Sequence, residues 1–483
     1  MSHPGGLSGT PVKPLEASII FLGTCSMRPS PTRNVSGNAI RIGREWTIVD
    51  CGEGTQHQIL KCSSHPTCGR ISPGNITRIL ITHLHGDHCF GLPGLINQVE
   101  NAMSASAKSS PPQQKQTKRP RHDGDEEDDT DDGSYMYGQN IIHIVGPRGL
   151  RNMIRAILLS SFTRMSCRFR VDELWTGRDV RRQQGSQQNS NGGAHFATVF
   201  GLANHPSEIP GVDLHPEADS TWIIPTHPAG GPMAASWTLR AAPLQHTIDS
   251  VGYAFIEGPH RGSLNVTKAL RDRLLTDENK TYQKALGIKN PLQLLGFLQK
   301  GESAAIKEGG IVVQLDPREY VSSPTPGRKL VVLGDTCDSR KLAGLAANAD
   351  MIVHEATNAA IEEGETRDAV AKLAVSRGHS TPEIAGAFAR ACGAKQLVLT
   401  HFSSRYKGDD SAESIAIMNR IVEYAVETFE SNSVIAAQDM MEIKLTAQKG
   451  PRDLVSPSTA MEAAAAAADF YLGRRGRLGN PDD

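Results

Sequence analysis

The sequence predicts an α/β fold in which two β-sheets pack face to face and helices cover their outer sides. Short runs of β-branched and aromatic residues alternate with helical stretches along most of the 483 residues. Several of the apolar runs end directly on a histidine or an aspartate. Alternating strands and helices are typical of layered α/β domains, and strand ends are where such domains assemble their sites. We therefore expect a large sandwich whose functional residues gather at one edge of its sheets.

The predicted strands are short apolar runs bounded by turn residues. They cover residues 18–23, 39–49, 76–82, 141–145, 237–242, 252–257, 329–334, 350–354 and 396–400. Two helices carry clear signals. The helix predicted at 382–392 has Pro382 in its first turn and Gly393 as its stop. The helix predicted at 412–429 repeats apolar residues at helical spacing, which indicates one buried face.

Two polar stretches, residues 104–137 and 177–235, are predicted to be low-complexity insertions. The first contains a basic patch, 115–121, and an acidic block, 123–132. Such sequences bury too little apolar surface to offset the entropy of ordering them. The basic patch also resembles a nuclear import signal, although short basic patches often arise by chance.

The expected organisation therefore has three parts. A flexible N-terminus is followed by one catalytic domain that carries both insertions, and a peripheral tail follows. Their bounds are 1–16, 17–449 and 450–483.

Bulk composition restricts the possible partners and compartments. The net charge is −1 and the sequence pI about 7.0, so nucleic-acid binding requires a local basic patch. Residues 148–182 are rich in arginine and supply one, with Arg148, Arg151 and Arg155 as candidate substrate-binding residues. The eight cysteines form no disulfide framework. No apolar run approaches a membrane helix, and no secretory signal is visible, so an intracellular location is expected, in the cytoplasm or nucleus, with an organelle still possible.

Four apolar strands lead into potential metal ligands. These residues are His83, Asp335, His354 and His401. One histidine at a strand end is often incidental, but four such positions indicate a site held on rigid elements.

The run from His83 to His88 is the centre of the expected site. His83 and His85 are two residues apart, so in an extended segment they point to the same side. Asp87 and His88 follow Gly86, which permits a tight turn. The run is compact enough to serve two neighbouring metal ions. Imidazole and carboxylate ligands suit zinc, with manganese, iron or cobalt as alternatives.

These residues resemble RNase Z, in its short form, a branch of the metallo-β-lactamase superfamily that matures tRNA 3′ ends. The similarity covers most of the chain outside the insertions and tails. The matching motifs are Leu22–Thr24, Pro31–Gly37, Asp50–Gln56, Ile81–Gly94, Gly334–Thr336, His354–Thr357, Gly378–Thr381 and His401–Tyr406. The resemblance implies the αββα sandwich of that superfamily.

The resemblance also implies the ligands of two zinc ions. One ion takes His83, His85 and His246, the other takes Asp87, His88 and His401, and Asp335 bridges the two. His143, His205, His215 and His227 have no comparable context, and we expect them at surface or loop positions.

Catalytic roles follow from the same resemblance. Asp87 is implied as the base, and His379, oriented by Glu355, as the donor of a proton to the leaving ribose oxygen. Ser403 and Arg405 of the last motif are candidate substrate contacts. The products would be a tRNA with a 3′-hydroxyl and a 5′-phosphorylated trailer.

The implied partner is precursor tRNA, and the short form implies a homodimer in which an arm of one subunit serves the other. Residues 177–235 occupy the region expected for that arm, but their sequence departs from an arm pattern. Two alternatives stay open. One is a metal-dependent phosphodiesterase of the same fold acting on a small molecule or DNA, and the other is a non-catalytic scaffold subunit.

Overall fold

The computed structural model describes most of the chain as two compact units. The described residues are 15–66, 68–109, 141–176, 202–225, 227, 236–260, 262–446 and 454–473. The smaller unit comprises residues 1–15 and 257–327, and the larger unit comprises residues 16–256 and 328–483. Most of the residues predicted as flexible N-terminus and as insertions lie outside the described residues. Within the described residues, no helix is both long and apolar enough to cross a membrane.

The first sheet of the larger unit has the strand order β18-β1-β2-β3-β4-β5-β6-β7, with β8 also paired to β6. Strands β1 to β3 are antiparallel, and β3 to β6 are parallel. Their bounds are β1 (Ala17–Gly23), β2 (Gly37–Ile42), β3 (Glu45–Cys51), β4 (Ile76–Leu80), β5 (Ile141–Pro147), β6 (Arg168–Leu174), β7 (Glu208–Ile209), β8 (Asp213–Leu214) and β18 (Glu442–Lys444).

The second sheet has the order β17-β16-β15-β14-β11-β10-β9. Strands β14 to β17 are parallel, and β11 is antiparallel to β14. Their bounds are β9 (Trp222–Ile224), β10 (Trp237–Leu244), β11 (Ser250–Glu257), β14 (Lys329–Leu333), β15 (Met351–Glu355), β16 (Leu397–Thr400) and β17 (Val434–Ala436). The hydroxyl of Tyr253 on β11 donates to the carbonyl of Ile81 at 2.8 Å and so ties the two sheets together.

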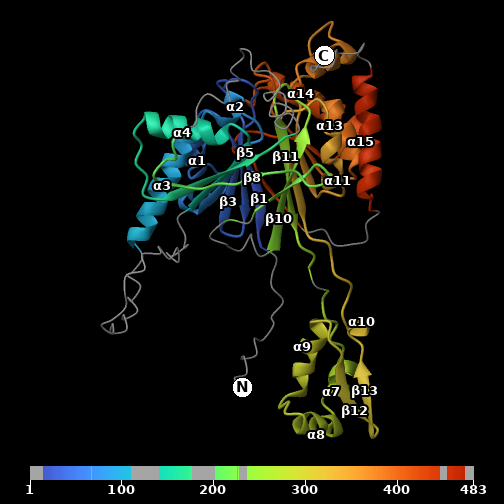
Figure 1. The fold of residues 1–483 in the computed structure, drawn as a ribbon. Coiled ribbons are helices and arrows are strands. Elements are labelled where there is room, and N and C mark those ends of the chain that lie inside the picture. Colours follow the sequence, from blue (N-terminus) through green and yellow to red (C-terminus); the bar gives the residue numbers. More distant parts are fainter. Residues whose placement is uncertain are drawn as a thin grey trace, which may run out of the picture. The chain divides into compact units, whose positions relative to one another are not determined.

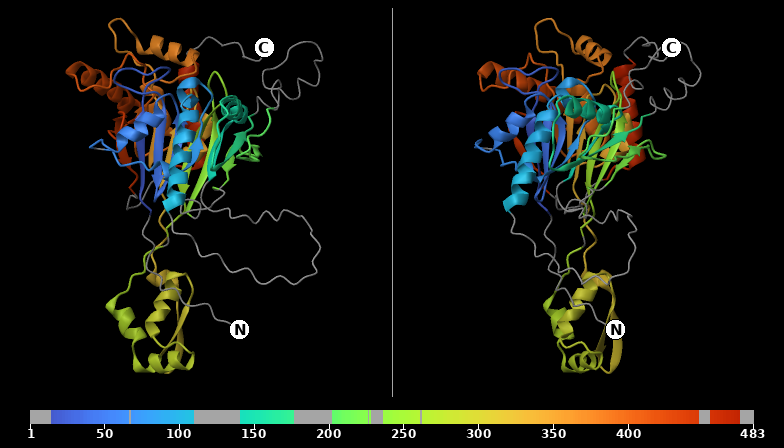
Figure 2. Two further views of the ribbon diagram at one scale, coloured as in Figure 1. Left: turned by 90° about the vertical axis from the view of Figure 1, so that its left-hand side faces the viewer. Right: turned by 60° about the vertical axis from the view of Figure 1, so that its left-hand side comes forward.

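Helices cover the outer side of each sheet (Figure 1). Beside the first sheet are α1 (Thr55–Cys62), α3 (Leu92–Ser109) and α4 (Leu150–Ser160), and the view turned by 90° shows α3 in front of its strands (Figure 2). Beside the second sheet are α11 (Ala343–Ala346), α13 (Pro382–Ala391), α14 (Ala412–Phe429) and α15 (Pro457–Leu472). Each sheet encloses a separate apolar core with the helices that cover it. The predicted αββα sandwich is confirmed.

The strand predicted at 39–49 is wrong in one respect, because the structure has two antiparallel strands there. β2 and β3 are joined at Gly43, whose φ of 63° makes the tight turn possible. The apolar residues continue on both sides of the turn, so the hydrophobic pattern alone did not show the break.

Residues 202–225 form strands β7 to β9, although composition placed them in an insertion. Trp222 and Ile224 of β9 are buried on one side of the strand, and this apolar run is short and follows a polar stretch. Likewise α3 continues to Ser109, past the predicted start of the first insertion. The predicted tail contains α15, in which Ala460 and Ala464 are buried.

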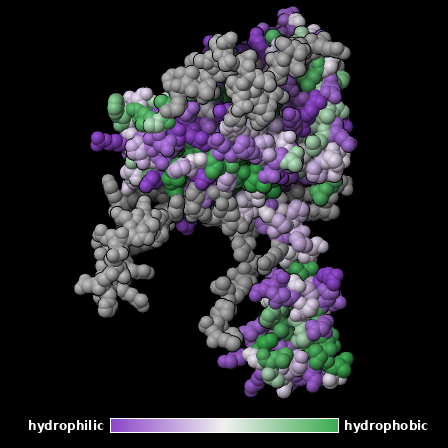
Figure 3. Space-filling view, in the orientation of Figure 1, coloured by the Kyte–Doolittle hydropathy of each residue, from purple (hydrophilic) through white to green (hydrophobic). Residues whose placement is uncertain are grey.

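The smaller unit, drawn in yellow in Figure 1, has a core of its own, formed mainly by leucines. Its elements are α7 (Lys268–Leu274), α8 (Asp277–Ala285), α9 (Leu294–Gln299), α10 (Pro317–Tyr320), β12 (Ala304–Glu308) and β13 (Ile311–Leu315). Hydrophobic residues also lie on its surface (Figure 3), and its exposed apolar side chains include Leu286, Ile311 and Val312. This unit was not predicted as separate, because residues 257–327 fall within the single domain expected over 17–449.

Candidate metal centre and catalytic site

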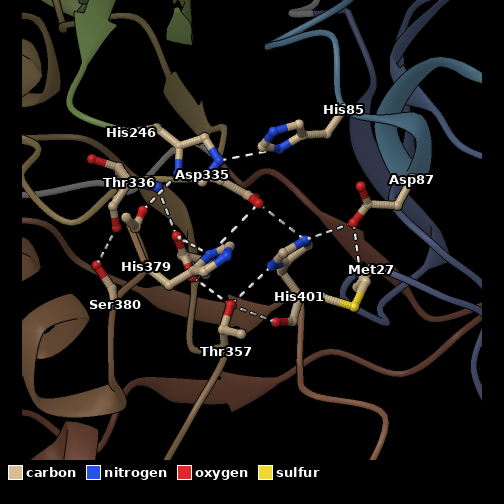
Figure 4. Close-up of polar contacts among 12 residues, drawn as sticks. Met27, His85, Asp87, His246, Asp335, Thr336, Thr357, His379, Ser380 and His401 are labelled. Carbon is tan, nitrogen blue, oxygen red and sulfur yellow. Dashed lines mark hydrogen bonds and ion pairs between the residues drawn. The ribbon is translucent and has the colours of Figure 1, made fainter. Parts of the chain in front are cut away.

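The predicted ligands converge from both sheets onto one cluster. His83, His85, Asp87 and His88 follow β4 of the first sheet, the last two on the short helix α2 (Gly86–Cys89). The other three ligands follow strands β10, β14 and β16 of the second sheet. They are His246, Asp335 and His401 (Figure 4). Each rigid strand thus presents its ligand at the same edge.

Three histidines form the first group of possible ligands. Atoms of His83, His85 and His246 lie within 4.8 Å of one another. His246 Nε2 and His85 Nδ1 are 3.2 Å apart. His83 is fully buried, and its Nε2 atom has no hydrogen-bond partner among the described residues.

A second group consists of Asp87, His88 and His401, whose ligand atoms also lie within 4.8 Å of one another. His88 Nε2 and His401 Nε2 are 3.2 Å apart. Oδ2 of Asp87 lies 3.6 Å from His88 Nε2 and 3.4 Å from His401 Nε2.

Asp335 lies between the two groups. Its Oδ2 is 3.7 Å from His83 Nε2 and 3.3 Å from His401 Nε2. Its Oδ1 is 3.4 Å from His88 Nε2. One carboxylate therefore contacts both groups, which is the geometry expected of a bridging ligand.

Hydrogen bonds at the far side of the imidazoles fix their orientation. His246 Nδ1 donates to the carbonyl of Gly378 at 2.7 Å, and His88 Nδ1 donates to Asp50 Oδ2 at 2.7 Å. His401 Nδ1 lies 2.9 Å from the hydroxyl of Thr357. In a neutral ring these contacts hold the proton on Nδ1, so each Nε2 atom is directed into the cluster with its lone pair available to a cation, as in protein metal sites.

This arrangement fits a pair of bound cations. Lone pairs on nitrogen atoms 3.2 Å apart repel one another unless a cation lies between them. Two nitrogen ligands about 2.0–2.1 Å from a tetrahedral zinc ion are roughly 3.3 Å apart, so the spacing suits zinc. A bound cation would also explain why the buried Nε2 atom of His83 has no hydrogen-bond partner among the described residues, since buried polar atoms normally have one.

Burial also keeps several ligands in their metal-binding form. Burial lowers the pKa of His83 well below its usual value and lowers the pKa of His246 as well. Neutral imidazole is the form that binds metal. Burial acts the same way on His88, but the carboxylates of Asp335 and Asp50 outweigh it and raise the pKa of His88 well above the usual value. The same carboxylates would attract a metal cation.

His379 and Glu355 form a pair beside this cluster. Glu355 ends β15, and its Oε2 is 3.2 Å from His379 Nδ1. The backbone N–H of Thr336 donates to Glu355 Oε1 at 2.6 Å and holds the carboxylate in place. Burial lowers the pKa of His379, but the charges of Glu355, Asp335 and Asp87 prevail and raise it to about 9. His379 therefore carries a proton at neutral pH.

A cavity of about 420 Å³ opens onto the cluster. His85, Asp87, Asp335 and His379 all line it. A substrate in this cavity would reach the candidate ligands and the protonated histidine together.

His354 is not part of the cluster, contrary to its grouping with the other strand-end ligands. Its Nδ1 lies 2.8 Å from the backbone carbonyl of Glu355, and its Nε2 lies 3.1 Å from the hydroxyl of Ser339. Neighbouring side chains on a strand point to opposite faces, so Glu355 reaches the site and His354 does not.

The expectation of surface or loop positions is wrong for one of the four unassigned histidines, His143, which is buried within a strand. His205 and His227 lie in loops, although both are buried, and His215 is exposed. His143 lies on β5 and pairs with Asp172 at 2.8 Å. These buried histidines serve the packing around the first sheet.

The predicted substrate-binding arginines have structural partners. Arg155 forms a bidentate ion pair with Glu208, in which Nε lies 2.7 Å from Oε2 and Nη2 lies 2.6 Å from Oε1. Arg151 bonds to Asp213 at 2.9 Å and to the carbonyl of Val171 at 3.2 Å. These two arginines tie α4 to the edge of the first sheet, and their role in RNA binding stays a prediction.

Arg148, Arg405 and Ser403 also make contacts within the protein. Arg148 stacks over Trp175 at 4.3 Å. Arg405 pairs with Glu365 at 2.8 Å, and Ser403 N–H donates to the carbonyl of Thr357 at 3.0 Å. Their contact with substrate likewise stays a prediction.

Asp50 and Thr357 also support the site, although their roles were not predicted from the sequence. Asp50 holds His88 and also accepts bonds from the N–H and the hydroxyl of Thr82, each at 2.8 Å. Its φ of 62° is unusual for a residue other than glycine. An acid directly after the apolar run of β3 was the available signal.

Comparison with known proteins places this site in a family. Residues 32–132 match the metallo-beta-lactamase superfamily. The human protein named zinc phosphodiesterase ELAC protein 1 is 31% identical over 444 residues, covering 90% of this chain and 100% of the relative. The chain belongs to the ribonuclease Z family. Ribonuclease Z of Anoxybacillus flavithermus is 30% identical over 395 residues, covering 81% of this chain and 88% of the relative.

A solved structure of human tRNase Z, short form, is also similar to this chain. It is 24% identical, covers 89% of this chain and 100% of that chain, and has a TM-score of 0.49. Membership of the ribonuclease Z family rests on the sequence relatives.

Proposed function

We propose that the chain is a zinc-dependent endoribonuclease that removes the 3′ trailer from precursor tRNA. The observation that carries this proposal is the convergence of all the predicted ligands, together with His379 and Glu355, in one cluster that borders a cavity. Relatives named ribonuclease Z and zinc phosphodiesterase support the same reaction and metal. A scaffold subunit would not need an intact ligand set.

In this proposal each chain holds two zinc ions. His83, His85 and His246 hold one, Asp87, His88 and His401 hold the other, and Asp335 bridges them. The support is the two nitrogen-rich groups and the position of Asp335 between them. Bound metal ions would supply an activated water molecule and positive charge beside the phosphate.

Two residues of the chain would manage the protons. Burial opposes the ionisation of Asp87, but a hydrogen bond from His401 and the charge of His88 outweigh it and lower its pKa. Asp87 is therefore an anion that can accept a proton from the attacking water. His379 faces the same cavity and can donate its proton to the leaving ribose oxygen, leaving a tRNA 3′-hydroxyl and a 5′-phosphorylated trailer.

The smaller unit is the better candidate for the substrate-gripping arm that the family resemblance implies. It has its own core and is inserted between β11 and β14. Residues 177–235, considered for this role from the sequence, instead contribute β7 to β9 to the two sheets where they are described. We further propose a homodimer, as in the short form, and a reducing compartment such as the cytoplasm or nucleus, in keeping with eight free cysteines.

Cleavage of a precursor tRNA by the purified protein tests the proposal. We expect one cut after the discriminator base, which a chelator abolishes and added zinc restores. Asp87→Ala should abolish the cut, and Asp410→Ala, at an exposed position outside the site, should not. Rapid hydrolysis of a small phosphodiester or of DNA without cleavage of the precursor would favour the alternative enzyme. Zinc content well below two ions per chain would contradict the ligand assignment.

The role of His379 has a separate test. General acid catalysis typically contributes roughly 10²–10⁴-fold, so His379→Ala should lower kcat on precursor tRNA by about that factor at unchanged zinc content. The loss should be much smaller on bis(p-nitrophenyl) phosphate, whose leaving group needs no proton. An equal loss on both substrates would show that His379 acts in some other way.

A further inference from the structure

Two large apolar side chains are exposed at the mouth of the catalytic cavity. Phe90 is 70% exposed and Met27 is 80% exposed, and both line the cavity. Single exposed apolar residues are common on protein surfaces. These two, however, border the same cavity as the candidate ligands, and neither contributes to a described core.

The ring of Phe90 is held in one place. The N–H of Phe90 donates to the carbonyl of Gly86 at 2.9 Å, and the N–H of Gly91 donates to the carbonyl of Cys51 at 2.9 Å. A Cβ atom on Gly86 would lie only 2.4 Å from Cε2 of Phe90, so the ring packs directly against the glycine backbone. This side of the ring is covered while most of its surface faces solvent.

Met27 is fixed in a similar way. Its backbone N–H donates to Asp87 Oδ2 at 2.6 Å (Figure 4). Its φ of 65° lies in the left-handed region, which is unusual for a residue other than glycine. The contact with Asp87 places Met27 beside a candidate ligand, so its thioether side chain forms a second apolar wall of the cavity.

The charges of the cavity favour a neutral group at this point. The described residues that line it include the acids Glu53, Asp87 and Asp335 and contain no lysine or arginine. Beyond the metal ions, protonated His379 is the one cationic side chain among the described lining residues, and its proton is assigned to the leaving oxygen, so a second backbone phosphate would find no further cation here. A nucleobase, with a neutral aromatic face, suits Phe90 and Met27 better. The volume of about 420 Å³ is near the lower end for small-molecule sites and is too small for a base-paired helix.

We propose that Phe90 is a stacking platform for one unpaired nucleobase next to the scissile phosphate, with Met27 as the second contact. This inference rests on the proposed function and adds a base-binding subsite to it. Aromatic stacking on single-stranded RNA does not depend strongly on sequence. The subsite would therefore select for an unpaired nucleotide and would tolerate different bases.

The test combines variants of Phe90 with abasic substrates. Phe90→Leu should lower kcat/KM on precursor tRNA by roughly 5- to 150-fold, the range measured for stacked bases. Phe90→Tyr keeps the ring and should stay close to the wild type. Phe162→Leu is the matched control, because Phe162 is 88% exposed but follows α4 and does not line the cavity.

An abasic residue placed on either side of the cleavage point identifies the stacked base. At the stacked position, the abasic substrate should slow the wild type as much as Phe90→Leu does and should not slow the variant further. The proposal would be overturned if abasic substitution lowered kcat/KM equally in the wild type and in Phe90→Leu at both positions. It would also be overturned if Phe90→Leu cleaved the intact precursor as fast as the wild type. Zinc content of each variant separates stacking from damage to the neighbouring ligand His88.

A binding measurement distinguishes this inference from the proposed function. A precursor that carries 2-aminopurine at the stacked position should lose fluorescence on binding the wild type and not on binding Phe90→Leu. Quenching without cleavage would refute the proposed function and keep the base-stacking site. Cleavage without quenching at either flanking position would refute the stacking site and keep the proposed function.

Discussion

At the scale of single residues, Thr357 links the metal centre to the pair formed by His379 and Glu355. Its hydroxyl contacts His401 Nδ1 at 2.9 Å and donates to the carboxylate of Glu355. Loss of such an outer partner typically costs 10- to 100-fold in metal affinity or activity. We expect Thr357→Val to weaken zinc binding by roughly that factor, measured by competition with a chelator. Thr428→Val, which loses a hydrogen bond to the carbonyl of Glu383 on α13, is the control and should bind zinc like the wild type.

A second residue-scale prediction concerns the stability of the fold in acid. Burial lowers the pKa of His227 to about 4, below the usual value of about 6.5. Between these values the unfolded chain binds a proton that the folded chain excludes. Stability is therefore lost as the pH falls through this window, by up to about 3 kcal/mol.

His227→Gln removes this contribution. The free energy of unfolding should fall less between pH 7 and pH 4.5 in the variant than in the wild type, as measured by denaturant titration at each pH. The prediction would be contradicted if the free energies of unfolding of the variant and the wild type differed by the same amount at every pH.

The sequence predicted single residues well where a local motif carried them. The run from His83 to His88 follows a strand directly, so its spacing alone indicated a shared site. The sequence did not show whether His354 or Glu355 faces the site. Neighbouring side chains on a strand point to opposite faces, but the spacing does not indicate which of the two faces the site. The pairing of Arg155 with Glu208 was also hidden, since it depends on strand β7 far along the chain.

At the scale of elements, the C-terminal helix α15 packs onto the segment that follows Asp335. Arg340 bonds to Asp469 of α15 at 2.7 Å, and the end of α15 packs against the apolar cluster that contains Cys337. Ala460 and Ala464 are buried against the core of the second sheet.

Removal of α15 by truncation after residue 455 should lower the free energy of unfolding by roughly 3 kcal/mol, since apolar core surface is exposed. For a unit of this size this corresponds to a Tm decrease of roughly 4 °C, which calorimetry would measure. Truncation after Gly473, which keeps the helix, is the control. Unchanged Tm in the shorter protein would show that α15 adds no stability.

Elements were predictable where hydrophobic spacing was regular. The helix at 412–429 has the predicted bounds, and most strands lie within a few residues of theirs. Helix α15 was not predicted because a run of alanines gives little hydrophobic contrast between the faces of a helix. Strands β7 to β9 were not predicted because they are two or three residues long and are held in place by neighbouring strands.

At the scale of the whole molecule, the smaller unit can be tested as a separable part. Replacement of residues 258–327 by a short Gly-Ser turn should leave the larger unit folded, because Ile256 and Lys329 are already paired across β11 and β14. We expect zinc content and hydrolysis of bis(p-nitrophenyl) phosphate to persist, while cleavage of precursor tRNA falls at least about tenfold. Loss of zinc from the shortened protein would show that the larger unit depends on the smaller one.

The whole-molecule division was not predictable from composition, since residues 257–327 are as mixed in character as the larger unit. Two joined units with separate cores become visible only when the contacts are known.

The pairing of β11 with β14 has a broader consequence. To the second sheet, everything between these strands is equivalent to the loop of one hairpin, whatever its length or content. An ancestral chain could therefore gain, exchange or lose this segment in one step without moving a ligand of the metal centre. Under the proposed role of the smaller unit, its part of substrate recognition and the bond-breaking chemistry would then be inherited as separate modules.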